Sequence, residues 1–399
     1  MLKNKIIASI VCLGMMGTIV TGCGKSTSGS SVASSSKTSS ASGITEEEKE
    51  EINDTISNQP VCENTTTKGA DEYDQDDIGE HVFTFGHVGA EGCGMDVAGK
   101  VLDELISQKT DGKMRIEVYN SGQLGTDESM RYDCIDGAID FYSSNFQSYE
   151  TVVPEMAAMC MPFFYNSYDE IKEYLVYNDE LFEKSSELMK DAGYKLLRWQ
   201  GVGWRQLSTN TEIKGIDSFK GLALRIPTVE SFIKIWETLG ASTTAINSSE
   251  LFLALQQGMV DGQENPYDQI YTYGFGEVQK YVTNSNHVPY LQTTVMSDKV
   301  FEGLTETEKQ VIIDAGEEAA EYITDWSEKA QAYYLQALQD DYGMTYIDFD
   351  SIEGLRNDLF EKTYEPLYHE IKSEIEIGGG DPSFLDYYIT EVRGFELPE

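Results

Sequence analysis

Apolar side chains recur at two alternating spacings through most of the chain after residue 80. At Met114, Ile116 and Val118 they alternate with polar residues, which is the period of a β-strand. Between Val97 and Ile106 they recur every three or four residues, which is the period of a helix. Strand followed by helix, repeated along the chain, predicts an α/β fold.

The same pattern locates the individual elements. It predicts strands at 82–86, 114–118, 138–142, 195–199, 207–209 and 222–226, and helices at 97–106, 127–136 and 229–239. Pro227 ends the last of these strands. The glycine-rich loop from Gly86 to Gly94 lacks the spacing of a dinucleotide-binding loop and the Lys-Ser pair of a P-loop, so it is predicted to be a structural turn.

One predicted helix is longer than the others. From Thr305 to about Tyr342 the chain has no proline and one glycine, and its apolar residues form a stripe. Thr305-Glu306-Thr307-Glu308 has the form of a capping box, which marks the start of the helix. The helix would be roughly 55 Å long, enough to brace two lobes. Two helices broken near Asp340 are the alternative, and the sequence slightly favours one rod.

The first 80 residues lack the pattern of a folded domain. A short apolar run after two lysines ends in Val-Thr-Gly-Cys at 20–23, which predicts an export signal over 1–22. The tetrapeptide resembles a bacterial lipobox, in which the cysteine is acylated, so Cys23 is the predicted lipidation site. An ordinary signal peptide with a chance cysteine is the alternative. Residues 23–80, rich in Ser and then acidic, are predicted to tether an extracytoplasmic protein to the membrane through this lipid.

Charge and composition exclude several classes of function. The 399 residues include 69 acidic and 29 basic side chains, for a formal net charge of −40. A nucleic-acid-binding protein needs a basic surface to offset phosphate charge, so no nucleic-acid partner is expected. No two of the four histidines have the spacing of a zinc motif, so no metal site is predicted, and no cofactor is expected.

Four cysteines remain after the predicted lipidated residue, at positions 62, 93, 134 and 160. Export permits disulfides, and four cysteines allow three pairings. Solitary buried thiols are the alternative, and the spacing does not decide between them.

Several short motifs resemble those of one known family. Residues 255–266 read Leu-Gln-Gln-Gly-Met-Val-Asp-Gly-Gln-Glu-Asn-Pro, and residues 221–227 read Gly-Leu-Ala-Leu-Arg-Ile-Pro. Further motifs lie at 122–125, 137–140, 205–210, 277–281 and 283–287. Together they resemble the DctP-type solute-binding proteins of TRAP (tripartite ATP-independent periplasmic) transporters, over nearly all of residues 81 to about 345. The segment 261–266 is the most specific of these motifs.

The resemblance implies an α/β fold of the periplasmic-binding-protein type, with two lobes, a cleft between them and a long bridging helix. Lobe I would comprise 81–202 and 291–330, and lobe II 203–290 and 331–399. Such proteins capture a small organic acid outside the membrane and deliver it to the membrane subunits of a TRAP transporter. We therefore expect a binding protein rather than an enzyme, and a monomer.

Carboxylate capture gives three residues an expected role. A carboxylate loses its water on entering a cleft and needs charged donors in fixed geometry, which the planar fork of arginine provides. The resemblance implies that Arg225 forms this salt bridge, that Arg205 is a second ligand-binding arginine, and that the Asn265 amide bonds the ligand. Without the resemblance, Arg225 would be an ordinary arginine at the end of a strand.

Weaker candidates lie on segments that the resemblance places at the cleft. They are His87, Asp127, Asn145, Ser148 and Ser248. Asp127 could equally be a carboxylate that stabilises a helix N-terminus. Ser248 stands where many relatives have an aromatic residue, so we expect a smaller wall and a ligand bulkier or more hydroxylated than a simple dicarboxylate. Val88 replaces a polar residue of sialic-acid binders, which disfavours that ligand.

Two other functions are compatible with the sequence. A receptor could use the same fold to present its ligand to a sensor, and nothing in the sequence separates that role from transport. A secreted hydrolase could use paired carboxylates, for which Glu250, Asp261 and Glu264 are available. The sequence has neither a Gly-x-Ser-x-Gly elbow nor a metal-binding histidine pair, which disfavours a hydrolase.

Overall fold

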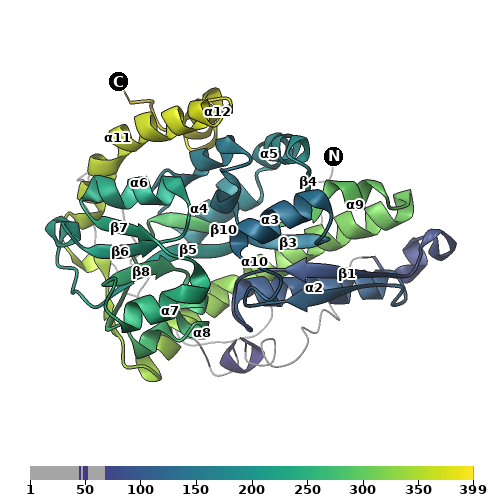
Figure 1. Ribbon diagram of the computed structural model, residues 1–399, viewed down its shortest axis with the longest axis horizontal. Coiled ribbons are helices and arrows are strands. Elements are labelled where there is room, and N and C mark those ends of the chain that lie inside the picture. Colours follow the sequence, from purple (N-terminus) through teal and green to yellow (C-terminus); the bar gives the residue numbers. More distant parts are fainter. Residues whose placement is uncertain (1–44, 46–47, 53–67, 399) are drawn as a thin grey trace, which may run out of the picture. The chain divides into compact units, whose positions relative to one another are not determined.

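The computed structural model describes residue 45, residues 48–52 and residues 68–398. The predicted export signal, the lipidation site Cys23, most of the tether and Cys62 lie outside these residues. From residue 68 onward the chain is a mixed α/β structure (Figure 1). None of the described helices combines the length and the apolar character needed to span a bilayer.

Eleven strands of the described chain form one hydrogen-bonded network. They are β1 (His81–Gly86), β2 (Met114–Tyr119), β3 (Phe141–Asn145), β4 (Tyr194–Leu196), β5 (Gln200–Thr209), β6 (Ala223–Ile226), β7 (Ser242–Ala245), β8 (Gly262–Asn265), β9 (Tyr281–Thr283), β10 (Val288–Ser297) and β11 (Thr345–Ile347). The main path runs β2-β1-β3-β10-β5-β8-β6-β7, with β4 paired to β10 and β9 paired to both β5 and β11.

Helices connect and cover these strands. They are α2 (Gly94–Lys109), α3 (Asp127–Asp136), α4 (Tyr168–Ile171), α5 (Asp179–Asp191), α6 (Glu230–Leu239), α7 (Ser248–Gln256), α8 (Tyr267–Thr272), α9 (Asp298–Glu302), α10 (Glu306–Asp340), α11 (Leu355–Ile377) and α12 (Ser383–Tyr387). Each helix predicted from the sequence is present, and α3 has the predicted bounds.

Parallel strand groups at the two ends of the path are joined by an antiparallel centre. β1 pairs in parallel with β2 and β3, and β6 pairs in parallel with β7 and β8. β5 and β10 run antiparallel to each other and lie between these groups (Figure 1). Parallel neighbours need a crossover connection, which α2, α3, α6 and α7 provide. The α/β class predicted from the periodicity is confirmed.

The long helix is continuous, as the sequence favours. α10 runs from Glu306 to Asp340 without a break. The Thr305 hydroxyl accepts from the Glu308 N–H at 3.2 Å, and the Glu308 carboxylate accepts from the Thr305 N–H at 2.9 Å, so the capping box is confirmed. A Cβ at Gly316 would lie only 3.3 Å from Leu197, which explains a glycine within the helix. α10 packs on α2, β5 and α8.

The chain immediately before β1 is packed against α10, although the sequence assigns it to the tether. Two short 3-10 helices form there. Lys68 Nζ and the Tyr73 hydroxyl each lie 2.7 Å from the Asp314 carboxylate on α10. These contacts over more than 200 positions of sequence hold residues 68–80 on the folded chain.

The third strand begins later than the sequence predicts. β3 spans Phe141–Asn145 rather than 138–142. Gly137 ends α3 in the left-handed conformation, with φ of 75°. The Ala138 N–H then donates to the Asp133 carbonyl oxygen at 2.8 Å. These residues satisfy the last carbonyl groups of the helix and are therefore not free to start a strand.

The cysteines of the described chain are solitary thiols. Cys93, Cys134 and Cys160 are buried and free, which is the alternative to a disulfide that the spacing left open. Among the residues described, no cluster of three or more His, Cys, Asp or Glu side chains could hold a metal ion.

Candidate ligand-binding site

One pocket is lined by residues from both parallel strand groups and from the two antiparallel strands between them. It holds about 720 Å³ of space, partly open to solvent, which is within the range of small-ligand sites. The strands contribute Ser144 and Asn145 (β3), Arg205 (β5), Arg225 (β6), Asn265 (β8) and Tyr290 (β10), and other segments contribute Val88, Asp127, Arg131, Ser148, Ser248 and Gln269. The pocket therefore brings together seven of the eight contact residues expected from the sequence, and His87 is the exception.

Arg225 is an unpaired cation in this pocket. Its side chain is only 2% exposed, and its Nε donates to the Ile246 carbonyl oxygen at 2.7 Å. Its Nη1 and Nη2 have no hydrogen-bond or ion-pair partner within the described ranges. The pKa of Arg225 is lowered to about 10, because burial and the charge of Arg205 together outweigh the opposite effect of Glu264. The guanidinium is protonated at neutral pH, so a buried positive charge lines the pocket without a counter-ion.

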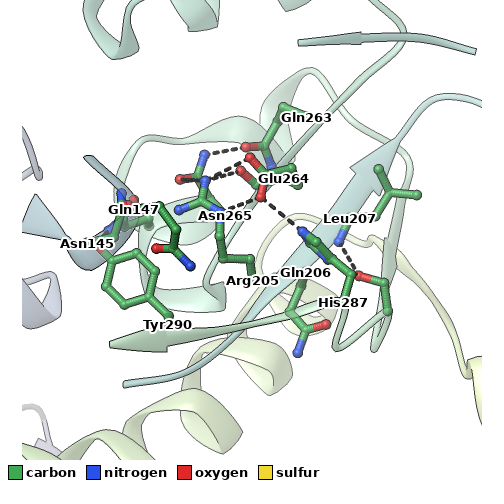
Figure 2. A network of polar contacts seen from close by, with 12 residues as sticks. Asn145, Gln147, Arg205, Gln206, Leu207, Gln263, Glu264, Asn265, His287 and Tyr290 are labelled. Carbon is green, nitrogen blue, oxygen red and sulfur yellow. Dashed lines mark hydrogen bonds and ion pairs between the residues drawn. The ribbon is translucent and has the colours of Figure 1, made fainter. Parts of the chain in front are cut away.

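Arg205, by contrast, has a counter-ion. Its Nε and Nη2 donate to the two carboxylate oxygens of Glu264, and the Nη2–Oε1 distance is 2.8 Å (Figure 2). Nη2 also donates to Asn265 Oδ1 at 3.1 Å. The rings of Phe232 and Tyr290 have their centroids 4.9 and 5.7 Å from the guanidinium carbon. Only Nη1 is left to donate to a ligand.

Glu264 is a part of the site whose role the sequence did not indicate. It is fully buried, and its Oε2 also lies 3.1 Å from His287 Nε2 (Figure 2). Burial raises the pKa of Glu264, but Arg205 and His287 outweigh burial and hold the pKa below its usual value. A carboxylate held ionised in this way is a poor general acid. Glu250 and Asp261, the other carboxylates of the hydrolase alternative, are exposed and do not line the pocket.

Two asparagine side chains are held in fixed orientations at the pocket wall. Asn265 donates through Nδ2 to Gln263 Oε1 and accepts through Oδ1 from Arg205 (Figure 2). Asn145 Oδ1 accepts from the Ser148 N–H at 3.0 Å. Because both amides are oriented by the protein, their remaining polar groups are available to a ligand in a defined direction.

The position of Asp127 is compatible with both roles that the sequence left open. It lies in the first turn of α3, where the helix dipole favours a carboxylate. Its Oδ1 accepts from the Tyr142 hydroxyl at 2.7 Å and from the Ser144 hydroxyl at 2.9 Å. It also lines the pocket, as Ser248 at the start of α7 does. Asp127 and Ser248 further border a second hollow that continues from the first.

His87 is not part of the pocket, which corrects the sequence-based expectation. Its ring is fully buried, with Nε2 3.8 Å from Asp96 Oδ1 and the ring edge packed on Phe85. Asp96 also binds Lys100 at 2.8 Å. Neither ring nitrogen has a hydrogen-bond partner among the described residues, so the ring is held in the core mainly by packing.

The pocket also contains residues that the sequence reasoning missed. Arg131 follows Asp127 by four residues on α3, so it lies one turn along the same helix face. That spacing was the available signal for Arg131. Gln269 and Tyr290 bond to each other at 3.0 Å and belong to segments that carried no local signal of a site.

Comparison with known proteins identifies the class that this fold and pocket define. The chain has the α/β fold of the two-lobed periplasmic solute-binding proteins, including the long helix. Residues 85–374 match the model of the bacterial extracellular solute-binding proteins, family 7 (DctP). The chain belongs to this family, and the resemblance stated from its motifs is confirmed.

Relatives of the family cover most of the chain. The sialic acid-binding periplasmic protein SiaP of Vibrio cholerae is 27% identical over 285 residues, covering 70% of this chain and 84% of that protein. The C4-dicarboxylate-binding protein DctB of Bacillus subtilis is 27% identical over 305 residues, which cover 74% of this chain and 86% of that protein. The crystal structure of the sugar acid binding protein DctPAm from Advenella mimigardefordensis, in complex with galactonate, is also similar, with a TM-score of 0.71 and 26% sequence identity. The match covers 78% of this chain and 98% of that protein.

Proposed function

We propose that this protein captures a small organic carboxylate in the pocket around Arg225 and delivers it to the membrane subunits of a TRAP transporter. The observation that carries the proposal is the buried guanidinium of Arg225, which has no counter-ion in the described chain. A buried charge is costly unless it is paired. A ligand carboxylate would supply the missing charge and accept from both free nitrogens. Arg205 Nη1 and the Asn265 amide would add donors beside it.

The relatives support an acidic ligand, and the pocket wall narrows its class. One relative holds galactonate, and two others are named for sialic acid and for C4-dicarboxylates. In this chain the apolar Val88 lines the pocket, which disfavours sialic acid. Ser248 gives the wall a small polar side chain. Both features favour a hydroxylated acid other than sialic acid.

We also propose that two lobes close over the acid. Lobe I would comprise 81–202 and 291–330, and lobe II 203–290 and 331–399. β5, β10 and α10 are the elements that cross these boundaries, and they would form the hinge. The proposal is supported by the two separate parallel strand groups, since each falls within one lobe.

The family is one of extracellular binding proteins, and the attachment of this member is a further proposal. We propose that Cys23 is acylated after removal of residues 1–22. The polar segment that follows would let a monomer move near its membrane partner.

Binding measurements with purified protein test the carboxylate proposal. At 100 times its Kd, the right acid should raise the free energy of unfolding by about 2.7 kcal/mol, whereas its amide should not. Arg225→Lys keeps the charge but loses the fork, so affinity should fall about 10- to 150-fold, and Arg225→Ala should lose more. The melting temperature of the empty variants should fall little, because Arg225 pairs with no carboxylate of the fold and, among the described residues, donates a hydrogen bond only to the Ile246 carbonyl oxygen.

Arg198→Lys is the matched control for these variants. Arg198 pairs with Asp179, which is 80% exposed, and it does not line the pocket. Its replacement should leave acid affinity unchanged. Acid binding that survives Arg225→Ala, or variants that simply unfold, would show that Arg225 has a structural role instead.

A further inference from the structure

Two of the seven arginines have no ion-pair partner among the described residues, and both line the ligand pocket. The other five form ion pairs: Arg115 with Asp103, Arg198 with Asp179, Arg205 with Glu264, Arg356 with Asp350, and Arg393 with Glu170. Arg131 and Arg225 have no such partner among the described carboxylates. The chain has 69 acidic side chains for 29 basic ones, so carboxylates are not in short supply. Asp127 and Glu128 also line this pocket, but neither guanidinium has an ion-pair partner, so both can receive a carboxylate of the ligand.

Arg131 has a hydrogen-bonding edge that is not satisfied by the described residues. Its side chain on α3 is 4% exposed, and its Nη1 donates to the carbonyl oxygen of Ser148. That bond fixes the plane of the guanidinium. Nε is buried and has no partner, and Nη2 donates to no group in the part of the chain that the structure describes. Arg205 holds the Glu264 carboxylate with the same Nε–Nη2 edge, so the free edge of Arg131 has the right shape for a carboxylate.

The acidic side chains next to Arg131 do not occupy this edge. Asp127 lies one turn earlier on α3, and its Oδ1 accepts from the hydroxyl groups of Tyr142 and Ser144. Glu128 is exposed and also lines the pocket, and neither residue forms an ion pair with Arg131. Asp127 nevertheless lines the pocket, where its carboxylate can accept from a ligand hydroxyl group.

We propose that Arg131 binds a second carboxylate, so that the ligand is a hydroxylated dicarboxylic acid held by Arg225 at one end and by Arg131 at the other. The inference rests on the proposed function, because it assumes that Arg225 receives the first carboxylate. Ser144, Asn145 and Ser148 line the pocket near Arg131 and would bond the hydroxyl groups of such an acid. A monocarboxylic acid would leave the Nε–Nη2 edge without a partner.

Acids that differ only at one end test this inference. D-galactonate and galactarate share a six-carbon skeleton and differ in having a terminal CH₂OH or a second carboxylate. D-erythronate and meso-tartrate are the corresponding four-carbon pair. In calorimetric titrations, at least one diacid should bind ten or more times tighter than its monoacid. Arg131→Gln should remove that advantage, lowering affinity for the diacid at least tenfold and changing affinity for the monoacid less than twofold.

Each other outcome has a defined meaning. Equal weakening of both acids by Arg131→Gln, or a lower melting temperature without a change in selectivity, would show that Arg131 only braces Ser148. Arg131→Lys keeps the charge and should retain part of the preference, which a purely structural arginine would not show. Monoacids that bind through Arg225 as tightly as the diacids would overturn this inference and leave the proposed function intact. Failure of every acid to bind would overturn both. Arg198→Gln serves as the surface control.

Discussion

Arg205 on β5 and Glu264 on β8 form a buried ion pair with two hydrogen bonds between guanidinium and carboxylate. The pair is neutral as a unit, so the pocket arginines without an ion-pair partner among the described residues are Arg225 and Arg131. Arg205 also orients the Asn265 amide through its Nη2. One arginine of the site is therefore mainly a support for the wall, while two others remain open to a ligand.

Replacing Glu264 should destabilise the empty protein. Glu264→Gln leaves the Arg205 guanidinium buried without a counter-ion, and breaking a buried pair on one side costs about 3–5 kcal/mol. Thermal unfolding followed by circular dichroism should show a melting temperature lower by several degrees. Glu250→Gln changes an exposed carboxylate on α7 and should leave it unchanged. Equal melting temperatures for the Glu264 and Glu250 variants would contradict a supporting role for the pair.

Asp96 should contribute stability that is lost in acid. Burial raises the pKa of Asp96, but His87, the Gly92 N–H and Lys100 outweigh burial and hold the pKa below its usual range. A lowered pKa in the folded state means that the unfolded state binds the proton more tightly, so this contribution is complete above about pH 4 and falls as the pH drops further. Asp96→Asn should be less stable than the parent at pH 7, and the difference should shrink below pH 4.

Denaturant unfolding at several pH values measures this difference. Glu91→Gln is the control, because Glu91 lies 3.8 Å from the same Lys100 but is 76% exposed. The free energy of unfolding of Glu91→Gln should differ little from that of the parent at every pH. A difference between Asp96→Asn and the parent that stays constant from pH 7 to pH 3 would mean that Asp96 is not the titrating group.

Ligand binding should make the protein more compact if the two lobes close about β5, β10 and α10. Small-angle scattering should give a smaller radius of gyration with a saturating acid than without it. Arg225→Ala at the same acid concentration should give the curve of the empty protein. Identical curves for the parent with and without a saturating acid would indicate a pocket that binds without closure.

Cys23→Ala tests the proposed attachment. The variant should be released from the membrane or accumulate as an unprocessed precursor, because the acylated side chain is missing. Cell fractionation followed by gel electrophoresis distinguishes these forms from the anchored protein. Unchanged membrane retention together with unchanged gel mobility would rule out lipidation at Cys23.

Much of the fold was predictable because its signals are local. The start of α10 is set by a capping box between Thr305 and Glu308, which are three residues apart. The apolar period that defines each strand or helix also lies within a short window of sequence. At Ala138 two local signals competed, an apolar run typical of a strand and a glycine that ends the preceding helix. The sequence predicted a strand there, but the Ala138 N–H belongs to the end of α3.

The sequence by itself determined the strand–helix order, the long helix, the family and the identity of Arg225 as the principal candidate for ligand contact. Only the tertiary structure decided which charges are compensated. Arg205 and Glu264 are 59 positions apart and meet because β5 and β8 pair in one register. His87 turns toward Asp96, and Arg131 is left with an open edge at the pocket. Charge pairing depends on distances between segments remote in sequence, and periodicity and caps, which act within a few residues, carry no information about those distances.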